Sequence, residues 1–303
     1  MGRDPERVRA ALTPTSRRER RRPQAMKVEV VRADVRTGEG LEQALAGVEL
    51  AYYLIHSMER VADERLAFPE RERLAAESFG AAAERAGVRR IVYLGGLIPR
   101  PLTQLTPAGA STEARMSRHL ASRAEVERVL LEAIPDSLAL RASIVIGARS
   151  RSFRLLVHLL ERMPVLTLPA WQTLRTQPID ERDVIEMLSA STTAQLPRRS
   201  LDIGGPDVLT YGEMLTSIAE LMLVRRPTLT LGVNLTGLTA RLAAAIAGED
   251  LALVLPLMEG LQEDLLPADH RAAELLGVRL HSFESAVEHA LAEWEQTEPL
   301  AAR

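Results

Sequence analysis

The feature that most constrains this chain is an alternation between two hydrophobic periods, which begins at residue 27. Short apolar or alternating runs, typical of strands, occur at residues 27–35, 49–55, 89–97 and 137–145. Runs with apolar residues three and four positions apart, typical of helices, separate them at residues 39–47, 69–87 and 111–133. Strands that alternate with helices predict an α/β protein built on a wound parallel sheet.

After Gly147 the pattern loosens. We expect helices over residues 152–163, 210–222 and 282–294, a further helix that begins near residue 181, and a strand over 199–205. Gly87 is placed to end the helix over 69–87, and Thr210 to cap the helix over 210–222. The inner face of the helix over 69–87 would carry Leu74, Phe79, Ala82 and Ala83.

These segments suggest three parts: a basic arm at residues 1–26, a Rossmann-like domain at 27–203 with a lobe insertion at about 149–177, and a mostly helical lobe at 204–303. The turn GGPD at 204–207 would use Gly204 and Gly205 at positive φ. The apolar stretch 235–260 is interrupted by Gly248 and Pro256, so we expect buried helices there.

Composition excludes several classes of function. The chain has no cysteine, which excludes disulfides and thiolate metal sites. Its net charge is −3, and the basic run at residues 17–22 has no aromatic residue nearby, so we expect no nucleic-acid partner. No apolar run has the length of a membrane span, and we expect a globular protein in the cytoplasm.

Six segments in order resemble the atypical short-chain dehydrogenase/reductases: GVELAYYLIHSM, FGAAAERAGVRRIVYLGGL, SRHLASRAEVE, LRASIVIGARSRSF, RTQPIDERDV and LDIGGPDVLTYGEM. More narrowly, they look like bacterial NAD(P)H-binding proteins related to nitrogen-regulator-like dinucleotide sensors and to the nucleotide-binding accessory subunit of respiratory complex I. The resemblance implies a Rossmann sheet with NAD or NADP bound across its switch point.

The resemblance also implies which residues would hold the cofactor. Asp34 and Val35 would contact adenine, although Asp34 is equally suited to stabilising a turn. The other implied contacts lie where later strands end, since ligands bind outside the carboxyl ends of parallel strands. They are Ile55 and His56, then Leu94, Gly95 and Gly96, then Ala142, Ser143 and Ile144.

The glycine-rich phosphate loop of the family, with its strand and helix, has no counterpart before residue 27. The opening MGRDPERV resembles the segment after the family's second strand, where Arg3 would neighbour an NADP 2′-phosphate; otherwise Arg3 is a terminal charge. The family's sheet order is 3-2-1-4-5-6, so two strands would be missing between 27–35 and 49–55. We expect the strand over 27–35 to pair across the gap, to pair with another chain or to be loosely held. We also expect either that the true start of the gene lies upstream or that the gene is truncated.

Catalytic members of the family use a serine after the fifth strand and a Tyr-x-x-x-Lys pair, whose lysine lowers the pKa of the tyrosine. Gly95 or Gly96 stands in the place of the serine, His119 in that of the tyrosine and Arg123 in that of the lysine. Lys27 is the only lysine of the chain, so the standard pair is excluded.

Three interpretations of His119 and Arg123 remain. They are structural, with Arg123 paired to Glu127; or Arg123 contacts the cofactor; or His119 replaces the catalytic tyrosine. We therefore predict an NAD(P)(H)-binding protein with weak or no standard reductase activity and a binding or regulatory role. The alternatives are an active NAD(P)H-dependent oxidoreductase that uses His119, and a scaffold without cofactor. We expect a dinucleotide and a small molecule as ligands and no metal, with a homo-oligomer left open.

Overall fold

A parallel sheet of four strands forms the centre of the protein. The computed structural model describes residues 4–12, 28–55, 68–98, 118–163, 165–168, 170–196, 199–224, 227–230 and 264–296. The strands are β1 (Leu50–Tyr53), β2 (Arg90–Gly96), β3 (Leu138–Ala142) and β8 (Ser200–Ile203), in the order β1-β2-β3-β8. Tyr53 lies opposite Tyr93, and Gly96 opposite Ala142, so the carboxyl ends of these strands share one edge. The predicted α/β class, with a Rossmann-like parallel sheet, is confirmed.

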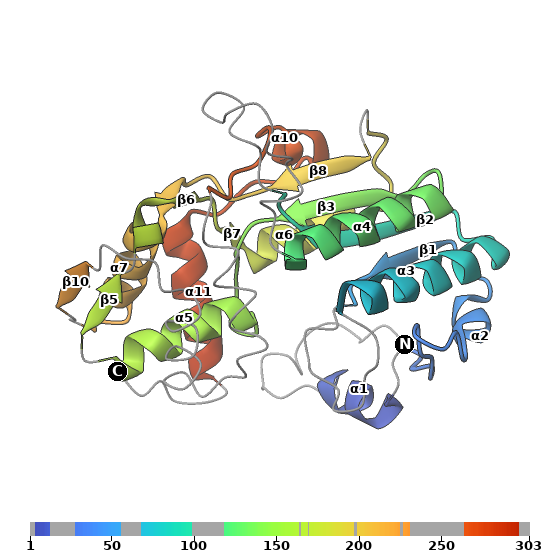
Figure 1. Cartoon of the computed structure of the whole chain (residues 1–303), viewed down its shortest axis with the longest axis horizontal. Coiled ribbons are helices and arrows are strands. Elements are labelled where there is room, and N and C mark those ends of the chain that lie inside the picture. Colours follow the sequence, from blue (N-terminus) through green and yellow to red (C-terminus); the bar gives the residue numbers. More distant parts are fainter. Residues whose placement is uncertain are drawn as a thin grey trace.

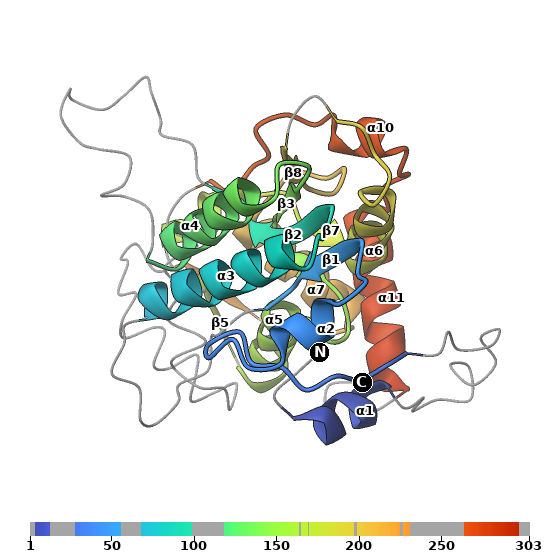
Figure 2. The same ribbon diagram turned by 90° about the vertical axis from the view of Figure 1, so that its right-hand side faces the viewer.

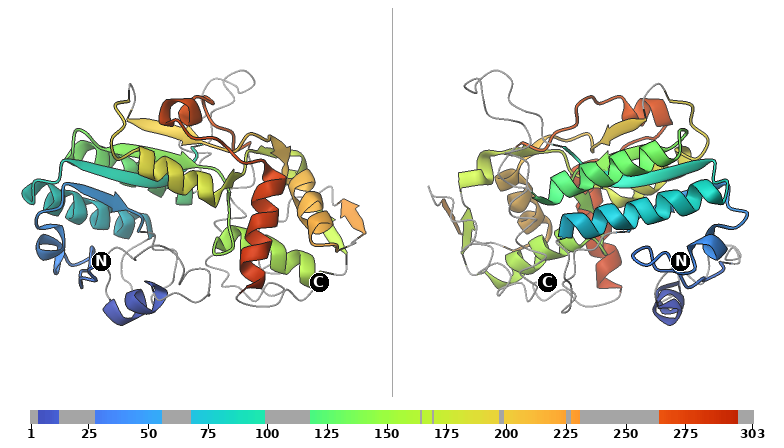
Figure 3. Two further views of the ribbon diagram at one scale, coloured as in Figure 1. Left: turned by 180° about the vertical axis from the view of Figure 1, so that it is seen from behind. Right: turned by 45° about the vertical axis from the view of Figure 1, so that its right-hand side comes forward.

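Helices cover both faces of this sheet. Helices α3 (Phe68–Arg85) and α4 (Arg118–Ala133) lie side by side on one face, and α6 (Glu181–Ala190) lies on the other (Figures 1 and 3). Phe79, Ala82 and Ala83 of α3 are buried as predicted, and the chain turns at Gly87 with φ 72°. Leu74 was expected on the same inner face but is 37% exposed, because the buried stripe of α3 runs through Ala75 and Ala76 instead.

A second group of helices forms a lobe beside the sheet (Figures 1 and 2). It contains α5 (Arg151–Arg162), α7 (Tyr211–Leu221) and α11 (Phe283–Glu295), which bury a shared hydrophobic cluster. Thr210 caps α7 as predicted: its hydroxyl accepts from the Glu213 N–H, and the Glu213 carboxylate accepts from the Thr210 N–H.

Short elements complete the described part. Strands β4 (Val145–Ile146) and β7 (Ile179–Asp180) pair, as do β5 (Leu166–Leu168) and β10 (Thr228–Thr230), and β6 (Arg175–Thr176) and β9 (Leu209–Thr210). The remaining helices are α1 (Pro5–Leu12), α2 (Leu41–Leu45), η3 (Ala170–Thr173) and α10 (Ala272–Leu276). None of the described helices combines the length and the apolar character that crossing a bilayer requires. The basic run 17–22 and the apolar stretch 235–260 lie outside the described residues.

Two predictions of local structure are wrong. Residues 28–35 form no strand; Arg32 makes a single isolated bridge, and Ala33 and Val35 are buried among side chains that pack on β1 and α3. A strand needs a neighbouring strand for its N–H and C=O groups, and in the described sheet β1 pairs only with β2. Neither Gly204 nor Gly205 has positive φ. Their surroundings leave little room for a side chain, since a Cβ atom at Gly205 would collide with the Pro178 carbonyl oxygen and one at Gly204 would lie 2.9 Å from Cγ of Pro267.

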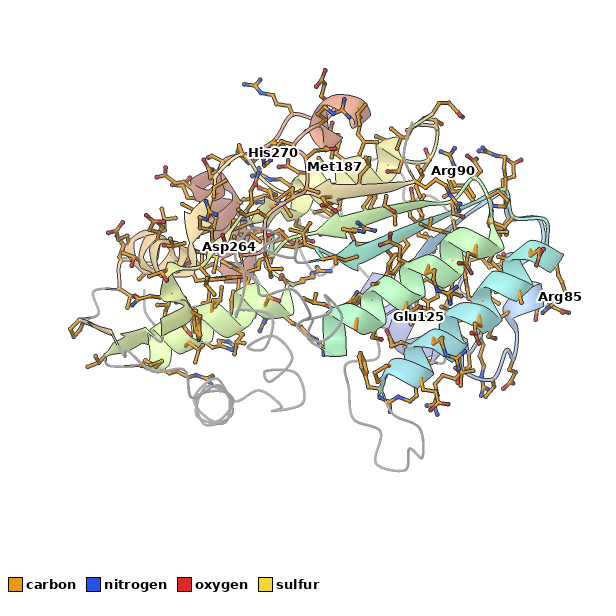
Figure 4. All side chains as sticks on the ribbon, turned by 45° about the horizontal axis from the view of Figure 1, so that its top comes forward. Arg85, Arg90, Glu125, Met187, Asp264 and His270 are labelled. Carbon is orange, nitrogen blue, oxygen red and sulfur yellow. The ribbon has the colours of Figure 1, made fainter. Side chains whose placement is uncertain are left out.

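One buried arginine joins the two faces of the sheet. The Arg90 guanidinium, at the start of β2, is 1% exposed and donates two hydrogen bonds to Asp136, with Nη2 2.7 Å and Nε 3.0 Å from its oxygens. Its Nη1 donates to the carbonyls of Ser191, Thr192 and Ala194, which follow α6. Figure 4 shows Arg90 at one end of the sheet layer, far from Asp264 in the lobe. The contacts hold the turn before β3 and the end of α6 against the start of β2.

Replacing Arg90 by methionine should lower the free energy of unfolding by about 2 to 4 kcal/mol, because three carbonyls lose their donor. Arg85→Met is the matched control. Arg85 pairs with Glu42 on the surface, where both side chains are more than half exposed, and an exposed pair contributes less than about 1 kcal/mol. Chemical denaturation of the two variants checks this; equal losses would contradict it.

Candidate functional site

The candidate site lies at the carboxyl edge of the sheet. Ile55 follows β1, Leu97 follows β2, and Ser143 follows β3. The chain stays in register beyond the strands, since the Leu97 N–H donates to the Ala142 carbonyl (3.0 Å) and the Ser143 N–H to the Ile203 carbonyl (3.2 Å). The structure therefore brings three of the predicted segments to one edge, the edge where open α/β sheets bind ligands.

Two glycines at the end of β2 have different surroundings. A Cβ atom at Gly95 would lie 2.8 Å from Cε1 of Tyr93, so the tyrosine ring extends along the strand over Gly95. A Cβ atom at Gly96 would lie 3.6 Å from Cδ2 of Leu120. The first turn of α4, which contains His119, thus packs at the carboxyl end of β2. Nothing is described of the His119 side chain.

Arg123 of α4 interacts with buried tyrosines of the sheet. The Tyr93 hydroxyl donates to the Arg123 backbone carbonyl at 3.4 Å, and the positive charge of Arg123 acts on the same hydroxyl. Tyr53 packs against Tyr93, with ring centroids 6.1 Å apart, and it too experiences the charge of Arg123. Glu72 of α3 is buried within range of both tyrosines. Tyr53, Tyr93 and Glu72 are buried between the sheet and the two helices, and Arg123 is half-buried beside them.

Burial controls the ionisation of this cluster. It raises the pKa of Tyr93 to about 12, although the neighbouring Arg123 charge acts in the opposite direction. Burial raises the pKa of Tyr53 as well, and the negative charge of Glu72 adds to the rise. A phenol that holds its proton so strongly is a poor acid or base at neutral pH. The Tyr93–Arg123 pair therefore does not reproduce the chemistry of a Tyr-x-x-x-Lys pair.

The structure shows other partners for Glu127 than the expected Arg123, because the Glu127 carboxylate is hydrogen-bonded to residues of the sheet. Its carboxylate, 5% exposed, accepts from Nε and Nη2 of Arg141 at 2.8 and 2.7 Å and from the Ser200 hydroxyl at 2.6 Å. Arg141 lies on β3 and Ser200 on β8. These bonds fix α4 across two strands.

Asp34, one of the two predicted adenine contacts, takes part in a local turn. The Asp34 carboxylate accepts from the Arg36 N–H at 2.9 Å, and the Asp34 N–H donates to the Glu39 carbonyl. Val35 is buried, and Ile55 packs against the same hydrophobic cluster. His56 lies outside the described residues. At Asp34 the structure thus shows the turn that the sequence offered as the alternative to an adenine contact.

The end of β3 leads into the lobe. Ala142 is buried, Ile144 packs against the lobe cluster, and the Ser143 hydroxyl is 3.2 Å from that of Thr176. Among the described side chains no group of three or more histidines and carboxylates is placed to hold a metal ion. The polar atoms here are neutral hydroxyls and backbone groups, which can orient a ligand by hydrogen bonds.

The sequence patterns used above did not single out Tyr53, Tyr93 and Glu72. Two patterns in the sequence point to Tyr93 and to Glu72. Tyr93 and Gly95 are two positions apart on one strand and so share a face, which leaves room for a ring beside the glycine. Glu72 is a carboxylate three, four and seven positions before Ala75, Ala76 and Phe79, on the apolar face of its helix. A charge there indicates a buried polar partner.

The chain has four tyrosines, and the pKa of each is raised above its ordinary value of 10.0, chiefly by burial. A folded-state pKa above the unfolded one stabilises the fold fully below pH 10, and that contribution is lost as the pH rises further. We expect absorbance at 295 nm to show fewer phenolates in the native protein than in urea at the same pH, between pH 10 and 11. Half-ionised tyrosines at pH 10 in the native protein would contradict this.

No family model matches the chain. No curated protein matches it either. Solved structures do. The structure called gox2253 superposes with a TM-score of 0.65 and 17% identity, over 98% of this chain and 95% of that one. A nucleoside-diphosphate-sugar epimerase from Staphylococcus aureus gives 0.65 and 15%, over 95% and 89%.

A third similar structure is TunA, an NAD-dependent NDP-hexosamine 5,6-dehydratase of tunicamycin biosynthesis, with a TM-score of 0.61 and 17% identity, over 87% of this chain and 82% of that one. Identities this low establish similarity of fold and do not transfer activity. The chain therefore has the Rossmann-like fold that these structures share.

Proposed function

We propose that the protein binds NAD(H) or NADP(H) at the carboxyl edge of the sheet and has weak or no standard reductase activity. The observation that carries the proposal is the convergence of three strand ends, those of β1, β2 and β3, at one edge, with the first turn of α4 packed at the end of β2. Similar structures include enzymes described as NAD-dependent or crystallised with NAD, which supports a dinucleotide as the ligand.

The residues at this edge fit the nicotinamide half of a dinucleotide better than the adenine half. Gly96 and Ala142 are small and lie opposite each other on neighbouring strands, so backbone can approach a flat ring closely. Ser143 and Ile144 follow, and Arg123 supplies a positive charge from α4. Asp34, by contrast, already uses its carboxylate in a turn. When bound, a nicotinamide supplies hydride transfer, and this chain's residues would bind and orient it.

In this proposal the cofactor binds to the sheet domain, residues 27–203, and a small molecule or partner binds to the helical lobe, residues 204–303. A regulatory or binding role is favoured over catalysis because the chain has no Tyr-x-x-x-Lys pair and its buried tyrosines keep their protons at neutral pH. The alternative is an oxidoreductase in which His119, in the first turn of α4, donates the proton.

Titration of the purified chain with NADH and with NADPH, followed by cofactor fluorescence, tests the proposal. We expect saturable binding to at least one of them, and loss of affinity in a Ser143→Trp variant, whose indole would occupy the half-buried position directly after β3. A surface change of the same kind, Ile185→Trp on the exposed side of α6, is the control. Absence of binding at millimolar cofactor would overturn the proposal.

Reduction of a panel of quinones and carbonyl compounds separates the two roles. We expect turnover close to the uncatalysed rate for the wild-type protein, and no change on replacing His119 by alanine. Clear turnover that is lost in His119→Ala, with NADH affinity kept, would establish the oxidoreductase alternative.

A further inference from the structure

Two hydroxyl groups meet where the end of β3 contacts the lobe. The Ser143 hydroxyl, directly after β3, lies 3.2 Å from the hydroxyl of Thr176 on β6. Ser143 is half-buried at the carboxyl edge, whereas Thr176 is 0% exposed. Within the described part of the chain, each of these hydroxyls has the other as its one hydrogen-bond partner. The pair thus joins a residue of the proposed cofactor edge to a residue inside the lobe.

The backbone of both residues is held by neighbouring segments. Thr176 pairs with Leu209 of β9 and also forms a bridge with Leu265. The Ser143 N–H donates to the Ile203 carbonyl of β8 at 3.2 Å. Because both backbones are fixed in this way, the two hydroxyls face each other before any ligand arrives, which lowers the entropy lost on binding.

Burial decides which of the two hydroxyls donates. Each hydroxyl carries one proton, and a buried proton without an acceptor costs free energy. If Ser143 donated, the proton of Thr176 would be buried without an acceptor among the described residues, because the nearby Tyr211 hydroxyl makes no hydrogen bond. If Thr176 donates, its proton is used, and the proton of Ser143 remains available at the half-buried edge. The hydrogen bond therefore runs from Thr176 to Ser143.

A serine hydroxyl whose oxygen already accepts a hydrogen bond offers a ligand its proton. It is therefore suited to an acceptor on the ligand. The carboxamide of a nicotinamide has one acceptor, its carbonyl oxygen, and one donor, its amide nitrogen. A fixed donor at the edge of the sheet would bond the oxygen and so determine which way the carboxamide lies.

We infer that Thr176 is a positioning residue for the dinucleotide: it donates to Ser143 and so directs the Ser143 proton to the carboxamide oxygen of the nicotinamide. Thr176 acts on the ligand only through Ser143. The inference rests on the proposed function, and it adds the direction of the hydrogen bond and the ligand atom that the site recognises.

Three variants of the full chain test the positioning role. Thr176→Val removes the buried hydroxyl and keeps the size of the side chain, and we expect the Kd for NADH, or for NADPH if that is the cofactor bound, to rise roughly two- to fivefold. Thr176→Ser keeps the hydroxyl and should bind like the wild type. The matched control is Thr216→Val, because the Thr216 hydroxyl is exposed and bonds the Gly212 carbonyl of its own helix.

Circular dichroism and thermal unfolding verify that each variant folds. Wild-type affinity in Thr176→Val would overturn the inference, as would equal weakening in Thr176→Val and Thr176→Ser.

A cofactor analogue tests the direction of the hydrogen bond. In the acetylpyridine analogue of the cofactor a methyl group replaces the amide nitrogen, and the carbonyl oxygen stays. If Ser143 donates to that oxygen, Ser143→Ala raises the Kd for the natural cofactor and for the analogue by the same factor, roughly three- to tenfold. A rise for the natural cofactor alone would mean that Ser143 accepts from the amide nitrogen, which contradicts the inference.

A double-mutant cycle with Ser143→Ala distinguishes positioning from a general loss of packing. If Thr176 acts through Ser143, Thr176→Val has no further effect on the Kd once Ser143 is replaced. An equal rise in both backgrounds would overturn the inference. Should Thr176→Val not fold, the comparison of the two cofactors in Ser143→Ala decides. A wild-type chain that binds neither cofactor would instead overturn the proposed function, and this inference with it.

Discussion

The buried guanidinium of Arg90 is the interaction on which the arrangement of layers depends. It sits at the start of β2 and bonds Asp136 and three carbonyls after α6, so one side chain fixes the turn before β3 and the end of the helix on the opposite face. A charge this deeply buried is tolerated because each of its three nitrogens donates to a carboxylate or carbonyl oxygen. From Arg90, β2 runs between β1 and β3 to the carboxyl edge, where Tyr93, Gly95 and Gly96 lie. One strand thus carries the main structural constraint at its amino end and the candidate site at the other.

The second feature that shapes this fold is the edge of β1 that faces away from β2. Within the described sheet β1 has a strand neighbour on one side only; its Tyr52 is 40% exposed, and Leu54, which follows the strand, is 49% exposed. Strand edges with apolar side chains are favourable places for another strand to pair. Residues 28–35, which alternate like a strand, do not occupy this edge as a strand: they pack Ala33 and Val35 into the core and turn at Asp34 instead. Hydrophobic burial alone does not make a strand without a partner for its backbone.

Sequence pattern predicted much of the fold because each element carries its own local signal. The strands over 49–55, 89–97, 137–145 and 199–205 correspond to β1, β2, β3 and β8, and Thr210 and Gly87 bound their helices as expected. The site was harder to predict. The sequence could place Arg123 and Glu127 one helical turn apart, but the Glu127 carboxylate binds Arg141, and the Arg123 carbonyl accepts from the Tyr93 hydroxyl. Those partners lie 30 and 14 residues away in the sequence. Whether residues so far apart in the sequence meet depends on how the helices and strands pack, which a local sequence pattern does not specify.

What the sequence determined by itself is chemical. A chain with one lysine at position 27 cannot form a Tyr-x-x-x-Lys pair, and a chain without cysteine cannot use thiolates, whatever its fold. It also determined the alternation that builds a parallel sheet. Only the tertiary structure decided which contacts the side chains of that sheet make. The Tyr93 ring lies over Gly95 and its hydroxyl bonds the Arg123 carbonyl, and burial raises the pKa of Tyr93 so that it stays protonated. The Glu127 carboxylate is hydrogen-bonded to β3 and β8. The physical reason is that ionisation and hydrogen bonding depend on burial and on neighbours brought together by packing, and both are properties of the folded chain.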